Sequence, residues 1–123
     1  MIDYRLILQP ALDLAGGTHT YEDVMAAVEA GTMQFWPGPH SAIVTQIEVT
    51  PQKKLLHFFL AGGTLPEIEA MLPPILAWGK SRGCQGATLC GRPGWQRSFL
   101  SALGWTPHGV VMGVDFSEDA TNG

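Results

Sequence analysis

Apolar residues recur at helical spacing near the start of the chain, and glycines interrupt the pattern twice. This pattern predicts a helix over Asp3–Ala15, with Pro10 in its middle, and a second helix over Tyr21–Ala30. Thr20 is a suitable N-cap for the second helix, and Asp23, three residues later, completes a variant of the capping box. The chain therefore begins with two short helices, each ended by glycine.

The next stretch is rich in β-branched and aromatic residues, and it alternates with a period of two. It predicts three strands over Thr32–Trp36, Ala42–Val49 and Leu55–Leu60. A tight turn at 51–54 favours antiparallel pairing of the second and third strands. One face of the middle strand carries Ile43, Thr45, Ile47 and Val49.

A longer helix follows the third strand. Thr64 and Glu67 form a T-x-x-E capping box, which predicts that their side chains cap each other at its start. The helix is expected to run to about Arg82, where a glycine ends it, and to bend at Pro73-Pro74 in its interior.

The remaining pattern predicts a buried strand over Ala87–Cys90, a helix over Gly94–Leu103 and a last strand over Val110–Phe116. Residues 117–123 are expected to form a flexible tail. The order is ααβββαβαβ, which predicts one α+β domain over residues 1–123. Its mixed sheet has three antiparallel strands followed by a parallel strand.

Composition limits the classes of function. Hydrophobic residues make up 46% and charged residues 15%, so a lightly charged surface is available to a protein partner or a second copy of the chain. The net charge of −4 and the scattered basic residues argue against nucleic-acid binding. No apolar run is long enough for a membrane span, and no basic cluster precedes the first apolar segment. We expect a cytoplasmic protein, with association with a virion as an open alternative.

Cysteine and histidine spacing indicates neither a disulfide framework nor a metal site. Cys84 and Cys90 lie in otherwise apolar segments, and we expect both to be reduced and buried. The spacing of the histidines and cysteines matches no zinc motif. We therefore predict no metal ligands among the four histidines, His19, His40, His57 and His108.

The order of elements resembles that of the GNAT (Gcn5-related N-acetyltransferase) family without its usual first strand. Two segments carry the resemblance, LAWGKSRGCQGATLCG at 76–91 and FLSALGW at 99–105. The set FWPG, AGGT and GRPGW is also similar to small GNAT-like proteins of tailed phages and prophages. The resemblance implies a GNAT-like sheet and, for active members, acyl transfer from acetyl-CoA to an amine.

The family's loop for the coenzyme diphosphate has the form R/Q-x-x-G-x-G/A, and the family's spacing places it on residues 63–68. None of its characteristic residues is kept. Pro66 has no N–H to offer, and Glu67 and Glu69 add carboxylates. Like charges about 4 Å apart repel by about 1 kcal/mol even in water. The candidate cofactor-binding residues that remain are a possible backbone nest and the basic loop after the fifth family strand, namely Ala61, Gly62, Gly63, Thr64 and Arg92.

The family's catalytic groups are also incomplete. The position of its general-acid tyrosine falls on Leu100, which cannot donate a proton. Glu48 and His57 are the candidate catalytic residues, because they lie on adjacent strands and could meet across the hairpin as a general base. A solvated cross-strand pair is the alternative interpretation.

We therefore predict a GNAT-like domain that has lost acetyl transfer and acts as a binding or structural module without a cofactor. The alternative is an active N-acetyltransferase that binds acetyl-CoA through an atypical loop.

Overall fold

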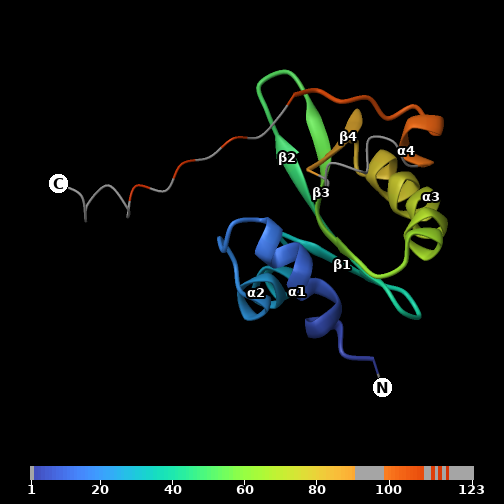
Figure 1. Ribbon diagram of the computed structural model, residues 1–123. Helices are drawn as coiled ribbons and strands as arrows, with labels where there is room; N and C mark the ends of the chain where they lie inside the picture. Colours follow the sequence, from blue (N-terminus) through green and yellow to red (C-terminus); the bar gives the residue numbers. More distant parts are fainter. Residues whose placement is uncertain (1, 91–98, 110–111, 113, 115, 117–123) are drawn as a thin grey trace. The chain divides into compact units, whose positions relative to one another are not determined.

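Figure 1 shows the computed structural model of the chain, which describes residues 2–90, 99–109, 112, 114 and 116. Two compact units are present, Met1–Leu89 and Cys90–Gly123. The first unit, called the sheet unit below, contains the sheet and three of the helices. Each unit is described by itself.

The sheet unit begins with two helices, α1 (Tyr4–Leu14) and α2 (Tyr21–Ala30). Pro10 lies at an exposed position inside α1, and the helix continues through it to Leu14. The capping box of α2 is complete, because Thr20 Oγ1 accepts from the Asp23 N–H while the Asp23 carboxylate accepts from the Thr20 N–H. Both helices and this capping box confirm the sequence prediction.

An exposed ion pair connects these two helices. The Arg5 guanidinium donates to both carboxylate oxygens of Glu22, at 2.6 and 2.9 Å, and this hydrogen bonding lowers the pKa of Glu22. The inner sides of the helices join the core formed with the sheet. Its buried members are Leu8, Leu12, Val24, Met33, Ala42, Val44 and Leu60.

Four strands form one sheet in the order β1 (Gln34–Pro37), β2 (Ala42–Val49), β3 (Lys54–Gly62) and β4 (Gly86–Leu89). The first three are antiparallel neighbours, and β4 pairs parallel to β3. Helix α3 (Leu65–Ser81) makes the crossover between β3 and β4. The predicted mixed sheet is therefore confirmed, with strand bounds that differ by a residue or two.

A β-bulge interrupts the alternation of β3. Val44 lies opposite Leu60, whereas the next residue of β2, Thr45, lies opposite Phe58. Phe59 is therefore an extra residue on β3 without a partner on β2, and the side chains after it move to the other face of the sheet.

The bulge lets β3 contribute to both layers of the core. Leu56, before the bulge, packs against Gly79 of α3. A Cβ added to Gly79 would lie 2.9 Å from Leu56 Cδ2, so the helix and the strand are very close at this point. Leu60, after the bulge, belongs to the cluster with Leu8 of α1. Strict alternation would have placed Leu56 and Leu60 on the same face.

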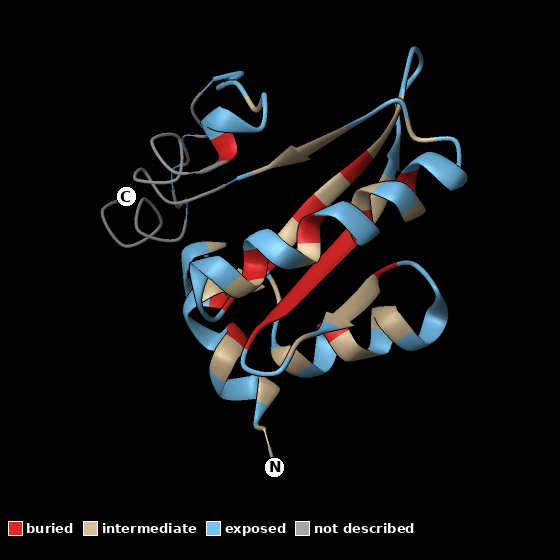
Figure 2. Ribbon diagram, turned by 90° about the vertical axis from the view of Figure 1, so that its right-hand side faces the viewer, coloured by how far each residue is buried: buried red, intermediate tan, exposed pale blue. Residues whose placement is uncertain are grey.

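Helices cover both faces of the sheet. Phe35 of β1 makes an edge contact with the Tyr4 ring of α1, with ring centroids 5.3 Å apart. Its neighbour Trp36 makes a similar contact with Trp78 of α3, at 5.5 Å. Because adjacent strand residues point to opposite faces, α1 and α3 lie on opposite sides of the sheet. Figure 2 shows the buried positions along the central strands and on the inner sides of the helices.

Helix α3 ends close to its predicted limit. Its last helical residue is Ser81, and Gly83 follows with φ of 85°. Pro73 and Pro74 both lie within this one helix, and both are exposed. None of the helices described here combines the length and apolar character needed to cross a bilayer.

The predicted burial of both cysteines is wrong. Both are free thiols, but Cys84 is half-buried and Cys90 is exposed. The apolar residues around Cys90 in the sequence suggested a buried strand end, whereas β4 stops one residue earlier, at Leu89. Burial of a strand end depends on what packs over it, which local sequence does not specify.

The C-terminal unit contains the short helix α4 (Phe99–Ala102), in which Leu100 is buried. The predicted helix Gly94–Leu103 begins outside the described residues, and so do the tail at 117–123 and much of the predicted strand Val110–Phe116. The residues of that strand which the structure describes have no strand assignment, and they expose large apolar side chains: Met112, Val114 and Phe116.

Candidate functional site

The glycines between β3 and α3 are packed closely against neighbouring parts of the chain. A Cβ on Gly62 would overlap the carbonyl oxygen of Ile7 in α1, and one on Gly63 would overlap the Ser41 side chain. Gly63 also has φ of 115°, a conformation that side-chain-bearing residues rarely adopt. The absence of side chains at these two positions is therefore used for close packing within the chain.

Residues 38–41, called the 38–41 loop below, connect β1 to β2 and contact the start of α3. The Thr64 N–H donates to Ser41 Oγ at 3.1 Å, and the His40 N–H donates to Glu67 Oε1 at 2.6 Å. The Gly38 N–H donates to the Ser41 carbonyl oxygen at 2.7 Å and closes the loop. These bonds connect the loop to the first turn of α3.

A hydrogen bond from α1 also supports this loop. The Tyr4 hydroxyl donates to the Gly38 carbonyl oxygen at 3.0 Å. Ser41 is fully buried, so its hydroxyl is a fixed acceptor rather than a solvated group. Helix α1, the 38–41 loop and the start of α3 thus form one connected arrangement.

The predicted mutual capping of Thr64 and Glu67 is wrong. Thr64 occupies the N-cap position, but its side chain makes no capping hydrogen bond. The Glu67 carboxylate accepts from the His40 N–H instead of the N–H at the N-cap, because the Thr64 N–H is bonded to Ser41. A tertiary contact has replaced the local one.

The first turn of α3 is poorly suited to bind an anion. A helix N-terminus attracts anions through its free N–H groups and its partial positive charge. Here Pro66 has no N–H, the Thr64 N–H is bonded to Ser41, and the Glu67 carboxylate adds negative charge. The basic residue of α3, Lys80, lies in the last turn, far along the helix. Arg92, the remaining candidate for cofactor binding, lies outside the described residues.

The two candidate catalytic residues are not direct cross-strand partners. Gln46 lies opposite His57, and Glu48 lies opposite Leu55. Glu48 and His57 are therefore diagonal neighbours on one face, at a typical separation of about 7–8 Å between such positions. Glu48 is exposed and His57 is half-buried.

His57 contacts a residue that sequence reasoning missed. Its Nδ1 lies 2.8 Å from the Thr88 hydroxyl oxygen on β4, and the two residues are paired in the parallel register. Gln46, His57 and Thr88 thus form one row across β2, β3 and β4, called the polar row below. All three are half-buried. No local signal could have identified Thr88, because the pairing of β3 with β4 joins residues on either side of α3.

The polar row lies on the face that α1 and α2 cover in part. Gln46 follows Val44 by two residues on β2, and Val44 belongs to the core beneath these helices. The connection between α1 and α2 reaches this part of the sheet, because the His19 ring lies against Phe59 at the bulge, with centroids 4.9 Å apart. Aromatic rings therefore lie close to the polar row.

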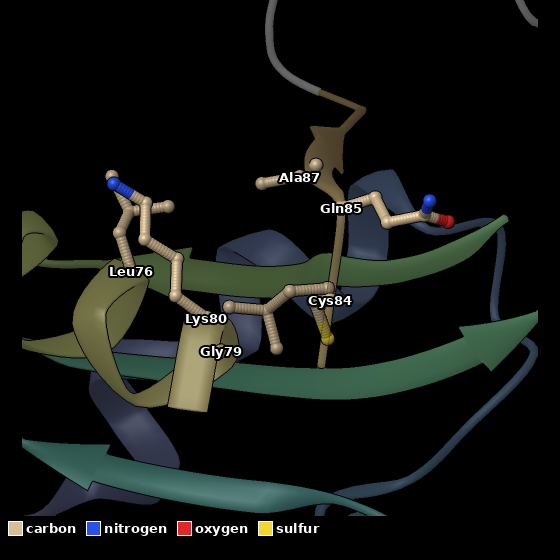
Figure 3. Close-up of a pocket in the computed structure, with 8 residues that line it drawn as sticks. Leu76, Gly79, Lys80, Cys84, Gln85 and Ala87 are labelled. Atoms are coloured by element: carbon tan, nitrogen blue, oxygen red, sulfur yellow. The ribbon is translucent and has the colours of Figure 1, made fainter. Parts of the chain in front are cut away.

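A small pocket of about 150 Å³ lies on the opposite face, between α3 and the strands β3 and β4. Figure 3 shows Leu76 and Lys80 on α3, with Cys84 and Gln85 on the segment that leads into β4 and Ala87 on β4 itself. Leu56 also lines this pocket. Because Leu56 and His57 are adjacent on β3, this pocket and the polar row are on different faces. The pocket is thus separate from the candidate site.

No protein-family model and no curated protein matches the chain, but solved structures resemble its fold. An acetyltransferase of Trypanosoma brucei is 13% identical with a TM-score of 0.61, over 94% of this chain and 96% of that chain. A mutant of the protein TTHA1254 from Thermus thermophilus is 14% identical with a TM-score of 0.59, covering 86% and 88%. A tetramutant of BH1408 from Bacillus halodurans is 12% identical with a TM-score of 0.58, covering 87% and 85%.

The chain therefore has a GNAT-like fold. The resemblance implies a coenzyme diphosphate at the N-terminus of α3, and the described residues there do not fit such a group. The bonded N–H of Thr64, the missing N–H of Pro66 and the carboxylate of Glu67 all oppose it.

Proposed function

We propose that this chain is a GNAT-fold domain that has lost acetyl-CoA-dependent transfer and acts as a cytoplasmic binding or structural module. The observation that carries the proposal is the start of α3, where the 38–41 loop and Glu67 take the place of an anion site. Its partner is another protein or a second copy of the chain. Association with a virion stays a prediction that rests only on short sequence resemblances.

The contact surface of this module is proposed at the polar row. Half-buried polar groups on an otherwise apolar sheet can give a partner defined hydrogen bonds. The bond to Thr88 is the hydrogen bond that His57 makes within the described part of the chain. Its Nε2 and the Gln46 amide are therefore the groups offered to a ligand.

Titration calorimetry of the full chain with acetyl-CoA tests the loss of the coenzyme site. We expect no binding heat, because placing the diphosphate on the first turn of α3 would bring it against the Glu67 carboxylate. A dissociation constant in the micromolar range, which corresponds to about −8 kcal/mol, would contradict the proposal.

A matched pair of variants sharpens this test. Glu67→Gln removes the charge at the 38–41 loop, while Glu69→Gln removes a charge from an exposed position of the same helix. We expect wild type and Glu69→Gln not to bind acetyl-CoA, and any binding gained to appear in Glu67→Gln. Binding gained equally in the two variants would show that the position of the Glu67 carboxylate has no special part in excluding the coenzyme.

The second candidate is an active N-acetyltransferase, and the contact between His57 and Thr88 favours it. A histidine ring held at Nδ1 on a central strand can accept a proton from an amine through Nε2. In this function the exposed Glu48 is a diagonal neighbour of the base rather than its partner. Acetylation of a panel of amines by wild type, abolished in His57→Gln, would support this candidate over the first.

A further inference from the structure

The His57 ring has two polar nitrogens, and which of them faces a ligand depends on how the ring is held. Among the described residues, the ring is held by one hydrogen bond, from Nδ1 to the Thr88 hydroxyl at 2.8 Å. This bond joins residues that are 31 positions apart in the sequence. It exists only because β3 and β4 pair in parallel.

The backbone favours a stable contact at this point. His57 and Thr88 are aligned as direct partners in the parallel register, so their side chains leave the sheet side by side. Threonine is β-branched, and its χ1 angle is therefore restricted on a strand. The half-buried hydroxyl of Thr88 is thus presented to Nδ1 in a defined position.

A second histidine–threonine contact in the same chain provides a contrast. Thr18 Oγ1 lies 2.8 Å from His19 Nδ1, but these residues are adjacent in sequence and their contact is exposed. Solvent can replace that bond at little cost, because the groups are already hydrated. The bond of His57 is half-buried and bridges two strands, so the same chemistry has a stronger orienting effect there.

We infer that Thr88 is a positioning residue, which holds Nδ1 of His57 and thereby presents Nε2 as the working nitrogen of the polar row. This inference rests on the proposed place of the polar row in ligand contact. The Thr88 hydroxyl can donate to Nδ1 or accept from it, so the contact holds the direction of the ring whichever nitrogen carries the proton. Thr88 therefore sets the direction in which Nε2 points.

Nuclear Overhauser spectroscopy of the full labelled chain tests the inference, because it reports which edge of the His57 ring faces residue 88. With Nδ1 on the Thr88 hydroxyl, the Hδ2 proton is on the other edge of the ring, so in wild type we expect its contact with residue 88 to be weak. Thr88→Val keeps the β-branched shape but removes the hydroxyl, so the ring loses its preferred direction and this contact should strengthen, by up to about fivefold for the loss of one ordinary net hydrogen bond. Thr88→Ser keeps the hydroxyl and should restore the weak contact of wild type.

Thr18→Val is the matched control, since it removes the exposed threonine partner of His19 and should leave the His57 signals unchanged. A strong contact between Hδ2 of His57 and Thr88 in wild type would overturn the inference without any variant, so a folding failure of Thr88→Val leaves it testable. An unchanged Hδ2 contact in a folded Thr88→Val would also overturn it. Binding of acetyl-CoA in the calorimetric test contradicts the proposed function, whereas it leaves the measurement of ring direction in the free protein intact.

Discussion

The starts of α2 and α3 have nearly the same capping sequence and different structures. At α2, Thr20 and Asp23 cap each other in both directions, as the local motif predicts. At α3, the Thr64 side chain caps nothing and Glu67 bonds to the backbone of His40. The two helix starts differ because the 38–41 loop contacts the start of α3. The loop supplies the Ser41 hydroxyl as an acceptor for the Thr64 N–H and the His40 N–H as a donor to Glu67.

This comparison shows how a tertiary contact changes the use of a local motif. A capping box satisfies two N–H groups at a helix start that faces water. Where a second segment offers its own donor and acceptor, the same side chains have alternatives of similar strength, and geometry selects among them. In the resulting arrangement the Thr64 N–H is bonded to Ser41 and the Glu67 carboxylate lies at the start of α3, which makes this helix end unfavourable for an anion.

Replacing Gly63 with alanine should have the largest effect on this arrangement. The substitution places a Cβ against the Ser41 side chain at a φ of 115°. We expect the free energy of unfolding to fall by about 2–4 kcal/mol, measured by urea denaturation. Gly31→Ala is the matched control, since Gly31 also has positive φ but no atom lies near its would-be Cβ. If both variants lose the same stability, packing against Ser41 contributes nothing.

Removal of the Glu67 side chain should have the next largest effect. Glu67→Ala breaks the charge-assisted bond to the His40 N–H and should lower the free energy of unfolding by about 1–2 kcal/mol. Glu69→Ala, at an exposed position of the same helix, should change it by less than about 0.5 kcal/mol. Equal losses in the two variants would indicate that the loop contact does not stabilise α3.

Alanine at the two N-cap threonines tests the comparison directly. Thr20→Ala should cost about 1 kcal/mol, as expected for an N-cap that makes its hydrogen bond. Thr64→Ala should cost close to nothing, because that side chain makes no capping bond. Both values are measurable by thermal unfolding. A larger loss at Thr64 than at Thr20 would reverse our assignment of the two helix starts.

The smallest expected effect is the pH dependence of the α2 capping box. The hydrogen bond from the Thr20 N–H lowers the pKa of Asp23 below its usual value. Its contribution to stability is therefore complete above the pKa of the unfolded chain, about 3.9, and is lost as pH falls through the lower folded value. Urea denaturation of wild type and Asp23→Asn should differ slightly at pH 6 and converge near pH 2. A gap that widens on acidification would contradict this sign.

The sequence predicted the order of helices and strands from α1 to β4 because periodicity and caps are local properties. The predicted last strand, Val110–Phe116, has no strand assignment at the residues that the structure describes. The sequence also shows the paired glycines Gly62 and Gly63, but it does not show which segments pack against them. Close packing of Gly62 against Ile7 and of Gly63 against Ser41 depends on segments far away in the sequence. Glycines that resembled a possible nest for phosphate proved to accommodate the chain's own backbone and side chains.

The candidate site was predictable only in part. His57 and Glu48 were identified by residue type and strand position, but the pairing register separates them. The bulge at Phe59 could not be inferred, because an extra residue in one strand leaves the apolar pattern intact while it changes the faces. Thr88 was missed because it reaches His57 through a parallel pairing.

The sequence alone determined the succession of elements from α1 to β4, the α2 capping box and the GNAT-like resemblance of the chain, because each depends on residues within a few positions of one another. Tertiary structure decided the partner of Glu67, the faces of β3 and the contact between His57 and Thr88. These depend on which distant segments come together, and hydrogen-bonding groups with several possible partners are assigned only when those segments are in place.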